Sequence, residues 1–95
     1  MQMQVGTFVW DAVKEQVNIR KHGVGFLEAS RVFLDPHRKI FTDEKHSAHE
    51  PRFFCLGKVQ GKVLTVRFLH REGKIRIFGA GHWRKGRSYY EQKSV

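Results

Sequence analysis

Two short turn sequences divide the second half of the chain into three strand-like runs. Gln60-Gly61 and Glu72-Gly73 separate residues 52–59, 62–70 and 74–80, which are rich in β-branched and aromatic side chains. Two-residue loops that end in glycine are typical of tight β-hairpins, because glycine readily adopts the positive φ angles that such turns require. The sequence therefore predicts a three-stranded antiparallel meander in this half of the chain.

Tight turns at both positions also predict which side chains share a face of the sheet. Phe53 is expected opposite Phe68, and Phe68 opposite Ile77, which makes one face apolar. Phe54 is expected opposite Arg67 on the other face. The residues predicted on this second face are Glu50, Arg52, Phe54, Arg67, Lys74 and Arg76. One face is therefore expected to be core and the other basic.

The first half of the chain carries signals for a short strand and two helices. Phe8-Val9-Trp10 is predicted as a strand, and Asp11 follows it as a helix N-cap. Gly23 is a natural C-cap for this first helix. A second helix is expected over residues 26–33, and Asp35-Pro36 would end it because the residue before a proline disfavours helical backbone angles.

These elements predict a single α+β domain over residues 1–95. Two N-terminal helices are expected to pack on an antiparallel sheet of about four strands, since an amphipathic helix pair needs an apolar surface to cover. A short C-terminal helix is expected over residues 84–92, although Gly86 weakens it. Residues 39–42 form a possible further short strand.

The net charge of the chain is +9, and its distribution is uneven. Residues 1–50 carry seven Lys and Arg side chains and seven Asp and Glu side chains, so they are balanced. Residues 51–95 carry eleven Lys and Arg side chains but only two carboxylates, Glu72 and Glu91. An excess confined to one half predicts a face that binds a polyanion. A basic surface that serves only solubility is the alternative.

Cysteine content and hydropathy bear on the location of the protein. Cys55 has no partner for an intramolecular disulfide, which is typical of proteins from a reducing compartment. No run approaches the ~20 apolar residues of a membrane span, and the N-terminal residues lack the pattern of a signal peptide. The sequence therefore predicts a cytoplasmic protein without membrane association.

The basic face carries the groups that metal-independent RNA cleavage needs. Such cleavage requires a base for the 2′-hydroxyl, cations for the charge on the phosphate, and an acid for the leaving oxygen. Arg67 and Arg76 are candidates to clamp the phosphate through their planar donor groups. His82 is a candidate proton donor near neutral pH, and Glu50 a candidate base. Ordinary solvated sheet arginines are the alternative interpretation, above all for Arg76.

Other side chains are candidates for base stacking or metal binding. Phe54, Trp83 or one of the two tyrosines is a candidate to stack on an unpaired base. His46 and His49, with Asp43 and Glu44 nearby, resemble a loose metal site, but they lack the thiolates or the helical His-Glu-x-x-His context of a zinc motif. The sequence therefore predicts no metal and no other cofactor.

Several short segments, taken together, resemble the BrnT family of bacterial type II toxins, which share a RelE-like ribonuclease fold. These segments are Phe8-Val9-Trp10-Asp11, Asn18, Lys21-His22-Gly23-Val24, Phe26-Leu27-Glu28-Ala29, Val32-Phe33, Asp35-Pro36, Glu50-Pro51-Arg52-Phe53, Arg76-Ile77 and Tyr90-Glu91. They span almost the whole chain in order. Many relatives have Ser-Ala-Arg where this chain has Gly79-Ala80-Gly81, so an arginine that is frequent in the family is absent here.

The resemblance implies an endoribonuclease that arrests growth. It also implies a BrnA-like ribbon-helix-helix antitoxin that masks the toxin and binds operator DNA, so that DNA is contacted only indirectly. In some RelE-like nucleases a Glu, a strand Arg and a C-terminal His-Tyr set do the work. The nearest counterparts in this chain are Glu50, Arg67, His82 and Tyr90.

Residues and resemblance together predict a toxin that cleaves RNA by transesterification to a 2′,3′-cyclic phosphate. The predicted catalytic residues are Arg67, His82, Arg76, Glu50 and Tyr90. The predicted RNA-binding residues are Lys21, His22, Arg52, Phe54, Lys74, Trp83 and Arg84. Two alternatives remain open: a basic module that binds RNA without cutting it, and a docking domain for an acidic antitoxin segment.

Overall fold

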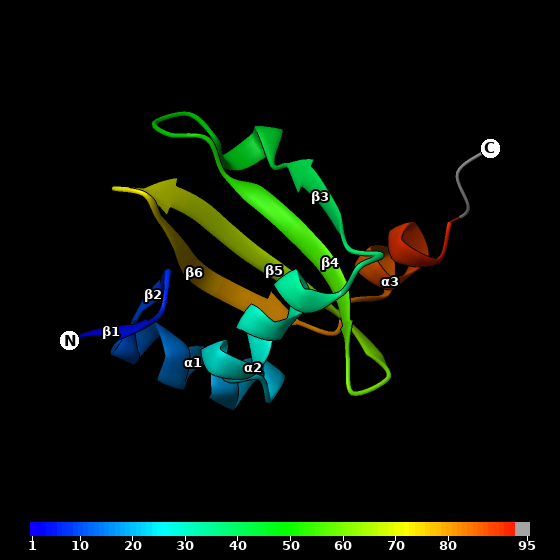
Figure 1. Cartoon of the computed structure of the whole chain (residues 1–95), viewed down its shortest axis with the longest axis horizontal. Coiled ribbons are helices and arrows are strands. Elements are labelled where there is room, and N and C mark those ends of the chain that lie inside the picture. Colours follow the sequence, from blue (N-terminus) through cyan, green and yellow to red (C-terminus); the bar gives the residue numbers. More distant parts are fainter. Residues whose placement is uncertain (93–95) are drawn as a thin grey trace.

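The structure is a computed structural model that describes residues 1–92, and it is built around one six-stranded sheet (Figure 1). The strands are β1 (Gln2–Val5), β2 (Phe8–Asp11), β3 (Lys39–Thr42), β4 (Phe53–Val59), β5 (Lys62–Arg71) and β6 (Lys74–Gly81). The helices are α1 (Ala12–His22), α2 (Phe26–Ser30) and α3 (Arg84–Glu91), with 3-10 turns η1 (Arg31–Leu34) and η2 (Glu44–His46). The strand order in the sheet is β1-β2-β6-β5-β4-β3.

The predicted layout of the fold was wrong, although the α+β class describes the mixture of elements. Two strands, β1 and β2, precede the first helix, and the sheet has six strands rather than about four. It is also mixed rather than antiparallel, because β2 runs parallel to β6. The pairing of β2 with β6 joins residues more than 60 positions apart, for example Val9 with Arg76. No local sequence signal encodes such a contact.

Both predicted hairpin turns are present in the meander β4-β5-β6. Gln60 and Gly61 have φ angles of 52° and 79°, and Glu72 and Gly73 have φ angles of 54° and 73°. Two successive positive φ angles are typical of a type I′ turn, whose twist matches that of the flanking strands.

The register that the turns predicted is confirmed. Phe53 pairs with Phe68, Phe54 with Arg67, and Phe68 with Ile77. The sequence did not predict the bulge that follows in β6. Arg67 pairs with Gly79, so Phe78 is the extra residue between two paired positions. A bulge re-aims the side chain of the extra residue.

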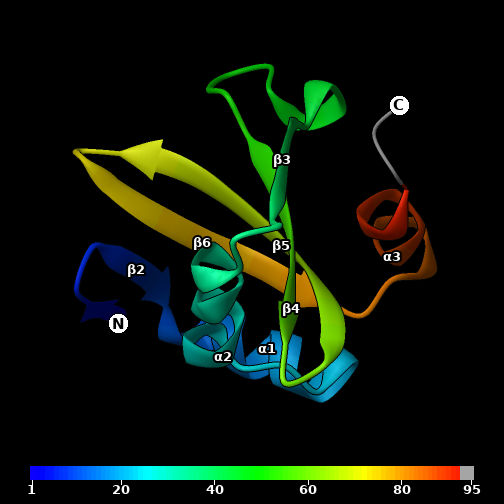
Figure 2. The same cartoon turned by 45° about the vertical axis from the view of Figure 1, so that its right-hand side comes forward.

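The core lies between the first face of the sheet and the layer formed by α1, α2 and η1 (Figure 2). Phe26, Phe68 and Ile77 are at most 1% exposed and lie at its centre. A Cβ atom at Gly57 would lie within 2.8 Å of the Val32 carbonyl oxygen, so only glycine lets η1 approach β4 this closely. Within residues 1–92, helix α3 covers one end of the second face of the sheet, where it packs on β4 and β5.

The two predicted caps of α1 are present. The Asp11 carboxylate accepts a hydrogen bond from the backbone N–H of Lys14 at 2.9 Å, and Gly23 ends the helix with a φ angle of 70°. Glu15 then ties α1 to its surroundings. Its carboxylate accepts hydrogen bonds from Trp10 Nε1 at 3.1 Å and from the backbone N–H of Phe26 at 2.8 Å, where α2 begins.

No helix in residues 1–92 is long and apolar enough to cross a membrane. The only cysteine, Cys55, is fully buried in the core. Burial raises the pKa of its thiol to about 12, so the thiol is neutral at physiological pH and is no candidate nucleophile.

Asn18 connects the helix layer to the sheet through three hydrogen bonds. Its Nδ2 donates to the carbonyl oxygens of Val24 at 2.8 Å and Ala80 at 2.9 Å, and its Oδ1 accepts from the backbone N–H of Ala80 at 3.2 Å. The side chain is buried, so these bonds have no competition from water. The contact holds β6 just before the strand ends.

We expect Asn18→Ala to lower the free energy of unfolding by about 2–4 kcal/mol, because it leaves buried backbone groups of Val24 and Ala80 without partners. Urea denaturation followed by circular dichroism measures this change. Gln16→Ala, at an exposed position of the same helix, is the matched control and should change stability by less than about 0.5 kcal/mol. Equal stability of the two variants would contradict the structural role of Asn18.

Candidate functional site

Two arginines converge over one aromatic ring on the second face of the sheet. The guanidinium carbons of Arg52 and Arg67 lie 4.9 Å and 5.1 Å from the centroid of the Phe78 ring. Such a cation–π contact stabilises each guanidinium, but two like charges over one ring repel each other. The bulge in β6 positions this ring, because Phe78 is the extra residue of β6. We call Arg52 and Arg67 the arginine pair.

The arginine pair has no carboxylate partner among residues 1–92. None of the ion pairs formed by these residues includes Arg52 or Arg67. The Nε atom of Arg67 is buried and makes no hydrogen bond to any residue from 1 to 92. Buried polar groups are normally paired, and an unpaired one is costly. The pair therefore presents several N–H donors to an anion that would satisfy them.

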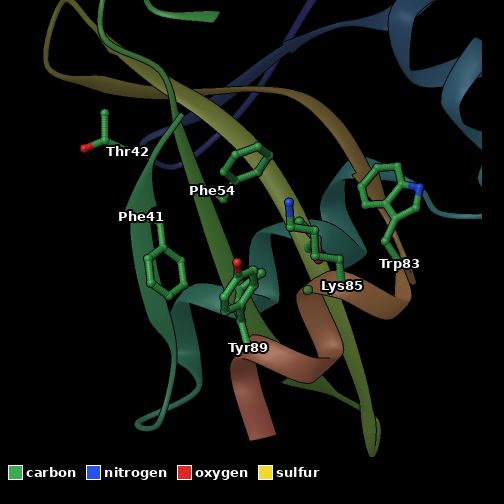
Figure 3. Close-up of a pocket in the computed structure, with 9 residues that line it drawn as sticks. Phe41, Thr42, Phe54, Trp83, Lys85 and Tyr89 are labelled. Atoms are coloured by element: carbon green, nitrogen blue, oxygen red, sulfur yellow. The ribbon is translucent and has the colours of Figure 1, made fainter. Parts of the chain in front are cut away.

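A cavity of about 570 Å³ lies between α3 and the sheet (Figure 3). Its walls include Phe41, Thr42, Phe54, Trp83, Lys85 and Tyr89, and its floor includes Leu56, Thr65 and Gly86. The lining contains four aromatic side chains and one cation but no carboxylate. The cavity adjoins the arginine pair because Phe54 pairs directly with Arg67 in the sheet. We call it the aromatic pocket.

Close packing on Gly86 holds α3 over the sheet. Gly86 is the only buried residue of α3, and a Cβ atom there would collide with Thr65 Oγ1 and would lie 3.3 Å from Leu56 Cδ2. The Thr65 hydroxyl is buried and makes no hydrogen bond within residues 1–92. Gly86 weakens helix propensity, as the sequence indicated, but it permits the approach that forms the pocket.

The C-terminal end of α3 is held by two polar contacts. Lys39 Nζ donates hydrogen bonds to the carbonyl oxygens of Tyr89 at 2.8 Å and Gln92 at 2.5 Å. The Tyr90 hydroxyl donates to Asp35 Oδ2 at 2.6 Å. A cation near the last carbonyl groups of a helix also interacts favourably with the helix dipole. Tyr90 is therefore an anchor of α3, whereas its neighbour Tyr89 lines the aromatic pocket.

The contact with Asp35 raises the pKa of Tyr90 to about 12, chiefly because the neutral phenol donates a hydrogen bond to the carboxylate. Burial acts to raise the pKa of Asp35. Hydrogen bonds from Lys58 N, Tyr90 Oη and His37 N outweigh it, and the pKa is lowered from its usual 3.8. The contact is thus complete at neutral pH, with the phenol neutral and the carboxylate charged.

Comparison with known families decides the relationship of this chain. The model of a family described as "Ribonuclease toxin, BrnT, of type II toxin-antitoxin system" matches residues 10–86. This chain belongs to the BrnT family. No protein with curated annotation matches it. Membership implies a ribonuclease toxin with an RNA target and an antitoxin partner, and the match covers both members of the arginine pair.

The other predicted phosphate ligand of this BrnT chain, Arg76, already has a side-chain partner. Arg76 lies on the second face, but its Nη1 donates a hydrogen bond to Gln2 Oε1 at 3.0 Å and so ties β6 to β1. Lys74 lies at the β5-β6 hairpin, opposite Arg71. The arginine pair therefore consists of Arg67, predicted as catalytic, and Arg52, predicted as RNA-binding.

The predicted base and acid lie toward opposite ends of β5. Glu50 forms an ion pair with Arg71 at 2.7 Å, and His82 Nδ1 lies 3.1 Å from the Val63 carbonyl oxygen. Arg71 and Val63 are eight residues apart, which corresponds to roughly 26 Å along an extended strand. The structure therefore does not bring Glu50 and His82 to one phosphate.

The remaining predicted RNA-binding residues lie near the start of α3. His22 contacts Trp83 edge to face, with ring centroids 5.0 Å apart. Lys21 and Arg84 are exposed. Trp83 joins this group to the aromatic pocket, of which it forms one wall.

The sequence did not point to Phe41, Phe78 or Lys85, and it offered the two tyrosines as stacking candidates without distinguishing Tyr89 from Tyr90. The bulge that positions Phe78 left no recognisable local signal. Phe41 lies on the edge strand β3, and its ring lies 5.7 Å from that of Tyr89. The helical period was a usable signal for α3, because it places Lys85 and Tyr89, four residues apart, on the same side of the helix.

Gly86→Ala is expected to displace α3, because the new Cβ would collide with Thr65 Oγ1. Overpacking of this kind costs about 1–3 kcal/mol in the free energy of unfolding. Thr65→Ala removes the colliding atom, so the double variant should recover a large part of the loss. A double-mutant cycle of thermal unfolding measures this coupling, with Ser88→Ala on the same helix as control. Additive effects would show that the two residues do not touch.

The stabilising effect of Tyr90 is expected to depend on pH. Its folded-state pKa is raised from 10.0 to about 12, so its contribution is fully present below pH 10.0 and is lost as the pH rises through about 12. The stability difference between the wild type and Tyr90→Phe should therefore be constant near neutral pH and shrink at alkaline pH. Chemical denaturation at several pH values measures it, and a difference that grows with pH would contradict the assignment.

Proposed function

We propose that the protein is a metal-independent endoribonuclease that cuts RNA held on the second face of its sheet. The observation that carries this proposal is the arginine pair: two guanidinium groups over Phe78 without a carboxylate partner among residues 1–92. Planar guanidinium groups bind phosphate through two parallel N–H donors. Family membership supports RNA as the source of that phosphate.

In the proposed reaction, the 2′-hydroxyl of a ribose attacks the adjacent phosphorus as the hydroxyl proton leaves. The bond from phosphorus to the 5′-oxygen of the next nucleotide breaks, and that oxygen takes up a proton. The products are a 2′,3′-cyclic phosphate and a free 5′-hydroxyl. Negative charge builds up on the phosphate oxygens in the transition state. Donors of Arg52 and Arg67 that are already in place would stabilise this charge without reorganisation.

The two candidate residues for proton transfer, His82 and Glu50, lie far apart on the sheet. His82 Nδ1 is hydrogen-bonded to a backbone carbonyl, which leaves Nε2 as the atom that exchanges protons. Glu50 already accepts a hydrogen bond from Arg71. Because these residues lie toward opposite ends of β5, we propose that at most one of them acts at the phosphate on the arginine pair. Arg67 and Arg52 then supply most of the acceleration.

The antitoxin is proposed to act on the same face. An acidic segment of a BrnA-like ribbon-helix-helix protein would satisfy the free donors of the arginine pair and so exclude RNA. Cleavage of RNA in the absence of this partner would arrest growth. Both activities place the protein in the cytoplasm, where its target is.

The proposal predicts cleavage of end-labelled RNA by the purified protein in the presence of EDTA. Arg67→Ala and Arg52→Ala should each lower kcat/KM by about 100-fold or more, as loss of one transition-state donor does. Arg20→Ala, an exposed position on α1 with the same charge change, is the control and should have little effect. Arg67→Ala and Arg52→Ala should each also reduce the slope of log binding constant against log salt concentration by about one, which corresponds to the loss of one phosphate contact.

His82→Ala and Glu50→Gln complete the same experiment. Loss of cleavage in only one of them, with the fold intact by circular dichroism, would identify the proton-transfer group. Full activity in both variants would show that neither side chain transfers the proton. Water would then carry it, and the protein would act by stabilising charge. Intact RNA despite tight, salt-sensitive binding by the wild type would overturn the nuclease proposal in favour of a non-catalytic RNA-binding module.

A further inference from the structure

We propose that the aromatic pocket binds an unpaired nucleobase of the RNA strand whose phosphate lies on the arginine pair. This inference rests on the proposed function, and it names the part of the substrate that the pocket reads. The geometry behind it is the direct pairing of Phe54, on the pocket wall, with Arg67. Cross-strand neighbours lie about 5 Å apart, so a base and its own phosphate can occupy the two positions together.

The chemistry of the pocket lining fits a nucleobase. Its aromatic walls supply flat apolar faces, and stacking on such faces is how proteins bind single-stranded nucleic acid without relying on sequence. Lys85 is its only charged lining residue, and Figure 3 shows the Lys85 amine directed into the space between Phe54 and Trp83. A cation at this place favours an anionic chain that enters the pocket. An acidic lining residue, which would repel such a chain, is absent among residues 1–92.

The indole of Trp83 packs closely on Gly81, which holds the ring in a position where a base can stack on it. A Cβ atom at Gly81 would lie 3.0–3.1 Å from the Cζ2, Cε2 and Cη2 atoms of Trp83, so the indole lies directly over the backbone of β6. The edge-to-face contact with His22 restrains the orientation of the indole further. Trp83 is nevertheless 37% exposed, which leaves indole surface available to a ligand. Tyr89, which contacts Phe41, lies on another wall of the pocket.

The size of the pocket also suits this occupant. Pockets for small organic ligands typically measure about 300–1,000 Å³, and the aromatic pocket measures about 570 Å³. A base in a duplex is stacked and paired, so it cannot enter. The protein should therefore bind and cut unpaired RNA in preference to duplex RNA.

The test uses a short 2′-O-methyl RNA, which cannot be cleaved, and the emission of Trp83. The chain has two tryptophans, and Trp10 is buried in the core, so only Trp83 can meet a base. We expect the single strand to quench this emission. An abasic oligomer of the same length should bind through its phosphates without quenching, and the duplex should behave like the abasic oligomer. Loss of quenching in Trp83→Phe identifies the reporter.

Tyr89→Leu is expected to weaken binding of the single strand roughly tenfold, as loss of one stacking ring does, and to leave binding of the abasic oligomer unchanged. Ser88→Ala, the neighbouring position on α3, is the matched control. Gly81→Ala should lift the indole from β6 and reduce quenching. Gly81 has no positive φ angle, so this substitution introduces no backbone strain.

Equal quenching by the abasic oligomer and the single strand, or wild-type affinity of Tyr89→Leu for the single strand, would overturn the inference. These results are independent of cleavage. A protein that cuts RNA in EDTA but fails this test retains the proposed function without a base pocket. Base-dependent quenching without cleavage would support the pocket and contradict the proposed nuclease activity. Quenching by the antitoxin alone, with none by RNA, would assign the pocket to the protein partner and overturn the inference.

Discussion

The hydrogen bonds between Asn18 and Ala80 are the contact on which the placement of the candidate site depends. They fasten the middle of α1 to β6, one residue before Gly81 and three residues before Trp83. The chain then leaves the first face, where the core is, and forms α3 on the second face. If β6 were free to shift against α1, the start of α3 would shift with it. A buried amide that does not itself line the aromatic pocket thereby positions one of its walls.

The first face of the sheet carries the core, and the second face carries the candidate site. The first face buries Phe68 and Ile77 beneath α1, α2 and η1, and this burial supplies the apolar driving force for folding. Among residues 1–92, α3 is the helix that packs on the second face, and Arg52 and Arg67 lie over the same Phe78 ring on this face. Arg52 and Arg67 lie over one ring without a carboxylate partner in the described part of the chain, which costs free energy that folding of the first face must offset. Binding of a phosphate would relieve that cost, which favours an anion as the natural occupant.

Local signals predicted the parts of the structure that depend on local geometry. Two glycine-containing turns were enough for the register of β4, β5 and β6, and hence for the position of Arg67 opposite Phe54. The caps at Asp11 and Gly23 were recognisable for the same reason. The parallel pairing of β2 with β6 was not, because it joins distant segments. β1 has four exposed residues, and its alternation of Gln with Met and Val is too short to predict a strand.

The site was predictable in composition but not in arrangement. Arg52 and Arg67 were both expected on the second face, yet the bulge that places Phe78 beneath them depends on how β6 accommodates β5. Tyr89 and Tyr90 illustrate the same limit on a helix. One residue corresponds to a rotation of about 100°, so a change of one position separates a pocket wall from an anchor on Asp35. Tyr90 was the residue chosen from the resemblance, and the structure gives it the anchoring contact.

The family match ends at Gly86, within α3, while the pocket extends to Tyr89. The arginine pair lies wholly inside the matched segment, whereas one aromatic wall of the pocket lies outside it. Phosphate binding and base stacking also depend on different physical interactions. Charge acts over about 10 Å and is weakened by salt, whereas stacking requires contact and is largely insensitive to salt. A nuclease of this kind would therefore owe its affinity for RNA to the arginine pair and its preference for unpaired bases to the pocket that α3 completes.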